Sequence, residues 1–104
     1  MILTNLSQYT LRDAVERWYR VNQYIPNQGH LLPSEAAPQI TAYLTEEIRD
    51  LTGTQTLDEM RVIERLIIEC LVQDNLTLTA TVKRVARLLK ETREKQRQLA
   101  ALSR

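Results

Sequence analysis

The sequence predicts an all-α protein: a four-helix domain with a long, basic, amphipathic C-terminal helix. Apolar residues recur at steps of three and four along most of the 104-residue chain, which is the spacing of helices that bury one side. Only two Gly and three Pro are present, too few for the turns of a multi-stranded sheet. Since the chain has no Phe, we expect a core of Leu, Ile and Val, with Trp18 and the four Tyr at its margins.

The first helix is expected to begin at Thr10, whose hydroxyl can accept a hydrogen bond from a free amide of the first turn. Asp13, three residues later, completes a capping-box pattern. Apolar positions continue to Ile25, and Pro26 should end the helix because proline has no amide proton to donate. The loop that follows contains the only histidine, His30, which we expect to lie on the surface.

Two further helices are predicted in the middle of the chain. One should begin at Pro33 and end at Gly53, because proline suits the first turn and glycine the left-handed residue after a helix. Its apolar stripe consists of Ile40, Tyr43, Leu44, Ile48 and Leu51. The other should follow the capping residue Thr56 and continue to about Val72. Apolar residues cover most of its circumference, so we expect this helix at the centre of the fold, enclosed by other helices or by a second subunit.

The fourth helix should begin between Thr77 and Thr79 and run close to the C-terminus. Alternating steps of four and three form a heptad seam, which is apolar in its first half and polar at Thr92 and Gln96. The seam positions are Leu78, Val82, Val85, Leu89, Thr92, Gln96 and Leu99. No linker divides the chain, so we expect a single domain over residues 1–104 with a polar C-terminal extension at about 92–104.

Charge is distributed unevenly along the chain. Residues 75–104 carry eight basic and two acidic side chains, and residues 1–74 carry six basic and eleven acidic ones. The net charge of +1 therefore combines a basic C-terminal helix with an acidic remainder. Such asymmetry favours contact with an acidic surface, either on a partner protein or on another copy of the chain.

The cations of the fourth helix are the candidate partner-binding residues. They are Lys83, Arg84, Arg87, Lys90, Arg93 and Arg97. At about 100° per residue several of them lie beside the apolar seam, so the helix should present one core stripe and one cationic stripe. A second copy could also pair through the heptad seam, and a homodimer is expected. The alternative is a monomer whose basic side chains are simply solvated.

The segment Leu78–Leu89 resembles the recognition helix of helix-turn-helix DNA-binding proteins. In that family, small polar residues at the helix start contact bases and nearby basic residues contact phosphates. The resemblance implies Thr79, Thr81, Lys83 and Arg84 as possible DNA contacts. The chain departs from the family at Leu76, where the tight turn usually has Gly, and in the length of the helix. DNA binding is therefore the second hypothesis.

No catalytic, cofactor-binding or metal-ligating residues are predicted. The sequence has no glycine-rich phosphate loop, no His or Cys at ligand spacing, and no nucleophile with a base partner. Its single cysteine, Cys70, lies in an apolar run and is expected to be a buried thiol in a reducing compartment. No apolar run is long enough to cross a bilayer, so a cytoplasmic location without a membrane partner or small-molecule substrate is expected. The sequence thus favours a small, non-catalytic regulatory or adaptor protein.

Overall fold

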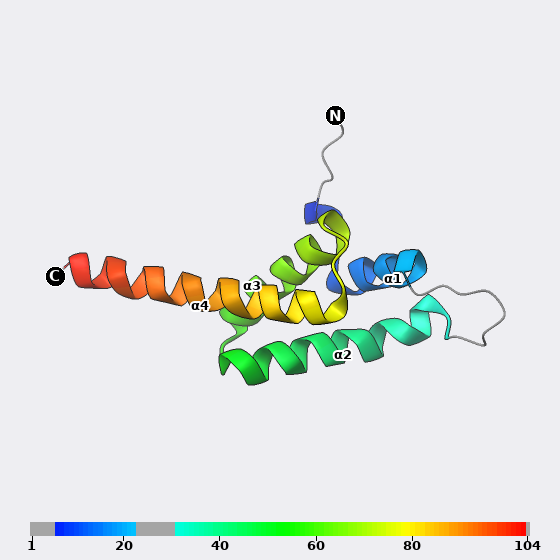
Figure 1. The fold of residues 1–104 in the computed structure, drawn as a ribbon, viewed down its shortest axis with the longest axis horizontal. Coiled ribbons are helices and arrows are strands. Elements are labelled where there is room, and N and C mark those ends of the chain that lie inside the picture. The colour runs from blue at the N-terminus through cyan, green and yellow to red at the C-terminus, as the bar shows by residue number, and fades with distance from the viewer. Residues whose placement is uncertain (1–5, 23–30, 104) are drawn as a thin grey trace, which may run out of the picture.

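A computed structural model describes residues 6–22 and 31–103, and these form the all-α fold that the sequence predicts (Figure 1). The elements are a 3-10 turn at Leu6–Gln8 (η1) and helices at Leu11–Asn22 (α1), Pro33–Thr52 (α2), Leu57–Ile68 (α3) and Leu78–Leu102 (α4), with a π-helical turn at Glu69–Gln73 (η2). The expectations for Ile25, Pro26 and His30 lie outside the described residues.

Threonine side chains cap the starts of three helices, as their sequences predict. Each hydroxyl accepts a hydrogen bond of 3.1 or 3.2 Å from the amide three residues later. The pairs are Thr10 with Asp13, Thr56 with Glu59, and Thr77 with Ala80. At the end of α2, Gly53 has a φ of 64° and its amide donates to the Arg49 carbonyl, which confirms its predicted capping role.

The third helix does not remain a regular α-helix to Val72. After Ile68 it widens into the π-helical turn η2, where the Asp74 amide donates to the Glu69 carbonyl five residues earlier. The wider turn directs three consecutive side chains, Cys70, Leu71 and Val72, into the interior. Consecutive buried residues have no simple α-helical period, which is why the sequence pattern did not reveal the π turn.

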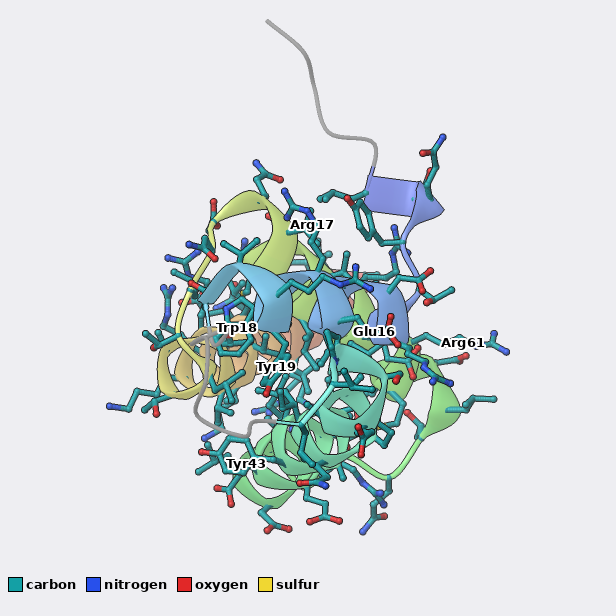
Figure 2. All side chains as sticks on the ribbon, turned by 90° about the vertical axis from the view of Figure 1, so that its right-hand side faces the viewer. Glu16, Arg17, Trp18, Tyr19, Tyr43 and Arg61 are labelled. Carbon is teal, nitrogen blue, oxygen red and sulfur yellow. The ribbon has the colours of Figure 1, made fainter. Side chains whose placement is uncertain are left out.

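Helix α1 supplies the aromatic part of the core. Trp18 is 3% exposed and Tyr19 is 9% exposed, so these two belong to the core and not to its margins, contrary to the expectation from composition. Each has a partner for its polar atom: Trp18 Nε1 donates to the Leu76 carbonyl at 2.7 Å, and the Tyr19 hydroxyl donates to the Leu31 carbonyl at 2.9 Å. Figure 2 shows Trp18 and Tyr19 on the side of α1 that faces the other helices.

Helix α3 is buried on one side: three of its twelve residues are buried, so it is not the enclosed central helix that the sequence predicted. Ile63 and Ile67 are fully buried, and α3 packs against both α1 and α4. Its exposed large apolar side chains are Leu57, 67% exposed, and Val62, 42% exposed. Most of the apolar surface that suggested a second subunit is therefore covered within the chain itself.

Helix α4 lies along α2 and α3 for its first half and then projects beyond them (Figure 1). The described residues measure 61 × 36 × 20 Å with a radius of gyration of 15.6 Å, whereas a compact domain of 100 residues has about 13 Å. The difference reflects the projecting end of α4. None of the helices in residues 6–22 and 31–103 combines the length and the apolar character needed to cross a membrane.

Candidate interaction surface on helix α4

The first half of α4 has a buried side and a charged side. Val82, Val85 and Leu89 on the predicted seam are 6%, 0% and 2% exposed, and they pack in the core. Further along the seam Thr92, Gln96 and Leu99 are exposed. The seam therefore holds α4 to the body only up to its middle.

An open groove of about 490 Å³ runs between the end of α2 and the charged side of α4. It is lined by Leu51, Lys83, Ala86, Arg87, Lys90, Glu91 and Glu94. Leu51 is 50% exposed, although its place in the apolar stripe of α2 predicted a core position. The groove thus combines an exposed leucine with three of the predicted partner-binding cations.

The cations of the groove differ in how far they are already neutralised. Arg87 lies 3.6 Å from Glu91 one helical turn later, and both side chains are more than half exposed. Lys83 and Lys90 are exposed, and neither has an ion pair among the described residues. These two lysines are the cations most available to a partner.

Arg93, another predicted partner-binding residue, instead holds the fold together. Its guanidinium donates two hydrogen bonds to the Glu59 carboxylate, at 2.6 and 2.9 Å, and others to the Thr52 carbonyl and the Thr54 hydroxyl. Arg93 thereby joins α4 to the end of α2 and the start of α3. Arg93 is therefore not available to a partner. The sequence carried no signal for this contact, because Glu59 and Arg93 are 34 residues apart.

This contact changes the acidity of Glu59. The hydrogen bonds from Arg93, reinforced by its positive charge, lower the pKa of the Glu59 carboxyl, and burial opposes that shift only in part. The same contact raises the pKa of Arg93, which stays charged at any pH of interest. The two side chains are about one quarter exposed, so the pair is partly shielded from water.

The remaining candidates on α4 are two arginines near its ends. Arg84 donates to Asp74 at 2.7 Å, which ties the start of α4 to the turn before it. Arg97 lies 3.3 Å from Glu94 and is 73% exposed. Arg84 is therefore largely neutralised by its own chain, whereas Arg97 is free to exchange its weak exposed pair for another partner.

The four possible DNA contacts do not form one surface. Thr79 and Lys83 are exposed, but Thr81 is fully buried and its hydroxyl donates to the Thr77 carbonyl at 2.8 Å. Arg84 is paired with Asp74, whose carboxylate would repel a phosphate. Thr81 is thus a core residue, and the pattern that resembles a recognition helix corresponds only in part to an accessible surface.

A second, smaller pocket of about 210 Å³ lies between the start of α3 and the middle of α4. Its lining residues are Asp58, Glu59, Val62, Leu89, Thr92, Arg93 and Gln96. Val62 gives the pocket an exposed apolar wall and Asp58 carries a negative charge beside it. This pocket was not predicted, since it forms where residues 58–62 and 89–96 meet in space.

Chemically reactive groups are not gathered at either groove. In the part of the chain that the structure describes, no group of three or more His, Cys, Asp or Glu could hold a metal ion. Cys70 is buried, and burial raises the pKa of its thiol to about 11. The thiolate that would react or bind metal is therefore scarce at neutral pH.

Known proteins give no guide to how these surfaces are used. The exposed lysines, the groove beside α2 and the pocket beside α3 are the features from which a function has to be inferred. Comparison with protein-family models, with curated proteins and with solved structures gives no match for this chain.

Proposed function

We propose that this chain is a small, non-catalytic regulatory or adaptor protein that binds an acidic partner protein in the groove between α2 and α4. The observation that supports this most directly is that one open groove combines an exposed leucine, Leu51, with Lys83 and Lys90, two lysines without an ion pair among the residues that the structure describes. An apolar contact surrounded by charges that attract the partner is the usual composition of a protein interface.

The chemistry of the groove defines the kind of segment that would fit. An apolar side chain of the partner would lie against Leu51 and Ala86, and carboxylates on either side of it would approach Lys83 and Lys90. Lys83 and Lys90 are seven residues apart, about two turns and 10 Å along α4. An amphipathic helix with acidic residues beside its apolar stripe has matching spacings, so we expect a helical segment of this kind.

Binding can be measured with two designed peptides that share one leucine pattern, one flanked by Glu and the other by Lys. Fluorescence anisotropy should show binding of the acidic peptide only, with an affinity that falls as salt rises because the contacts are exposed. The double variant Lys83→Gln, Lys90→Gln should bind about 2- to 30-fold more weakly, since each exposed ion pair contributes up to about 1 kcal/mol. Leu51→Ala should weaken binding as well.

The matched control is Lys95→Gln, which removes an exposed lysine of α4 that does not line the groove. Its affinity for the acidic peptide should equal that of the unchanged protein. Equal binding of the acidic and basic peptides would contradict the proposal.

A duplex DNA probe in the same assay tests the second hypothesis. Thr79 and Lys83 are the two exposed members of the set that the helix-turn-helix resemblance implies, and they support at most a weak electrostatic contact. Tight, sequence-dependent DNA binding at physiological salt would favour that hypothesis over the protein partner.

A further inference from the structure

The projecting segment of α4, residues 94–103, is not covered by any other part of residues 6–22 and 31–103. All of its side chains are exposed, yet it stays helical to Leu102, and the Ser103 amide donates to the Leu99 carbonyl at 3.2 Å. A helix of about ten residues is marginal in water without tertiary contacts. Leu99 and Leu102, 66% and 82% exposed, are the groups on this segment that most favour burial.

These two leucines lie on one side of α4. At about 100° per residue, Leu99 and Leu102 are on the same side of the helix as the half-buried Leu88 and the exposed Thr92 and Lys95. The pocket of about 210 Å³ lies next to this side, between Val62 of α3 and the middle of α4, and Thr92 belongs to both. The chain therefore carries both an exposed leucine and an apolar pocket larger than a leucine side chain.

We propose that two copies of the chain pair through antiparallel α4 helices centred on Gln96, with Leu99 of each copy in the pocket of the other. In an antiparallel pair with this centre, position 99 lies opposite position 93, in the middle of the 89–96 stretch that lines the pocket. Leu102 then lies near Leu88 of the second copy. Leu99 of the same chain does not line the pocket.

The distribution of charge also supports an antiparallel pair centred on Gln96. Lys95 is one turn before Leu99, and no ion pair engages it within the described residues. In the antiparallel pair it approaches the pocket of the second copy, where Asp58 lies, and the symmetry repeats this contact. Two reciprocal Lys95–Asp58 contacts also separate the two Lys95 side chains, which would otherwise repel each other near the axis.

A second copy of the chain is the partner that fits the exposed leucine and the pocket. In a dimer with one two-fold axis, each copy fills the pocket of the other, so neither pocket remains open to bind a third copy. The contact area is small, so we expect a dissociation constant on the order of micromolar. The groove between α2 and α4 stays open in this dimer, because Lys90 and Leu99 are nine residues apart and hence about 180° apart around the helix. The dimer is thus independent of the proposed function.

Sedimentation velocity over a range of concentrations on both sides of the micromolar range should show a shift from the mass of one chain to twice that mass. Leu99→Glu should abolish the shift, because its carboxylate would replace the apolar contact and approach Asp58 and Glu59, and Arg93 in the pocket is already paired with Glu59. Ala101→Glu is the matched control: it adds the same charge to an exposed residue two positions away, about 160° around the helix from Leu99, and should still dimerise. A single-chain mass at every concentration, or a dimer that survives Leu99→Glu, would overturn the proposal.

A charge exchange tests the register. Lys95→Glu and Asp58→Lys should each weaken the dimer at least several-fold, and the chain that carries both changes should regain most of the loss. Circular dichroism of each variant first establishes that its helix content is unchanged. Single variants that weaken pairing without recovery in the double variant would show that these two residues do not meet.

Oxidative crosslinking tests whether the two α4 helices of the dimer are antiparallel. Gln96→Cys lies at the proposed axis and should form an intermolecular disulfide, whereas Ser103→Cys should not, because its two copies would be about 21 Å apart along the helices. Cys70 does not compete, since it is buried. Efficient crosslinking through Ser103→Cys would indicate parallel helices and overturn the antiparallel arrangement.

Discussion

At the scale of single residues, a cationic side chain that is paired with an acidic residue of its own chain supports the fold, and a cationic side chain without such a pair is available to another molecule. Arg93 and Lys90 are three residues apart in a basic helix. Arg93 contacts the Glu59 carboxylate at 2.6 Å, whereas Lys90 has no such contact in the part of the chain that the structure describes. The sequence predicted both as partner-binding, because a pattern of charges does not reveal which of them a distant acidic residue will neutralise. Burial likewise removes Thr81 from the accessible surface. The sequence alone could not distinguish this buried threonine from the exposed Thr79.

The Arg93–Glu59 contact leads to a prediction about acid stability. Arg93 lowers the pKa of Glu59 in the folded state, so the folded protein holds the Glu59 proton less tightly than the unfolded chain, whose glutamates titrate near 4.3. This stabilisation is fully present above about pH 4.3 and is lost as pH falls through the lower folded pKa. Arg93→Gln should lower the free energy of unfolding at neutral pH by about 1–2 kcal/mol.

Urea unfolding followed by circular dichroism at several pH values checks this. The difference between Arg93→Gln and the unchanged protein should shrink below about pH 4.3, because protonated Glu59 no longer attracts the guanidinium. Arg97→Gln, which removes an exposed pair on the same helix, is the control and should change stability by less than about 0.5 kcal/mol. A difference that stays constant down to strongly acidic pH would contradict the assigned role of Glu59.

At the scale of elements, local signals were sufficient to locate the helices. Thr56 and Thr77 cap their own helices, and Gly53 ends its own, so each boundary depends on residues within one turn. Features that join distant segments were not predicted: the π turn at residues 69–73 packs against α1, and both grooves form between separate helices. Helices could be read from the sequence, but not the surfaces between them.

The end of α4 provides a prediction at this scale. The sequence placed the extension at about residue 92, whereas the last side chain that joins α4 to the body is Arg93. A chain that ends at Gln96 should therefore unfold with the stability of the full chain, because it loses only exposed residues. A chain that ends at Glu91 should be less stable by about 1–2 kcal/mol, since it also loses the contacts of Arg93.

Chemical unfolding of the two shortened chains, each measured under conditions in which it is monomeric, compares them directly. Their lengths differ by five residues that include Arg93. Removing that one contact from the longer chain separates a specific effect of Arg93 from a general shortening of the helix: a chain that ends at Gln96 and carries Arg93→Gln should resemble the chain that ends at Glu91. Equal stability of the two shortened chains would show that Arg93 contributes little.

At the scale of the whole molecule, most large apolar side chains are buried in one core, and a few remain exposed where another molecule could contact them. The core joins all four helices through side chains such as Val15, Leu44, Ile67 and Val85, each fully buried. The large apolar side chains left exposed around the middle and the end of α4 include Leu51, Val62 and Leu99. These three are the apolar members of the groove, the pocket and the projecting segment.

A matched pair of substitutions on α3 tests this division. Ile67→Asp should unfold the protein, because a fully buried carboxylate without a partner costs several kcal/mol against a total stability of about 5–15 kcal/mol. Val62→Asp introduces the same charge five residues earlier, at a side chain that is 42% exposed. This variant should keep its helix content and a cooperative melting transition, but it should no longer dimerise, since Val62 forms the apolar wall of the pocket. Circular dichroism melting and sedimentation of both proteins give the answer: if Val62→Asp also unfolds, α3 is enclosed on that side, and if Ile67→Asp melts like the unchanged protein, the core lies elsewhere.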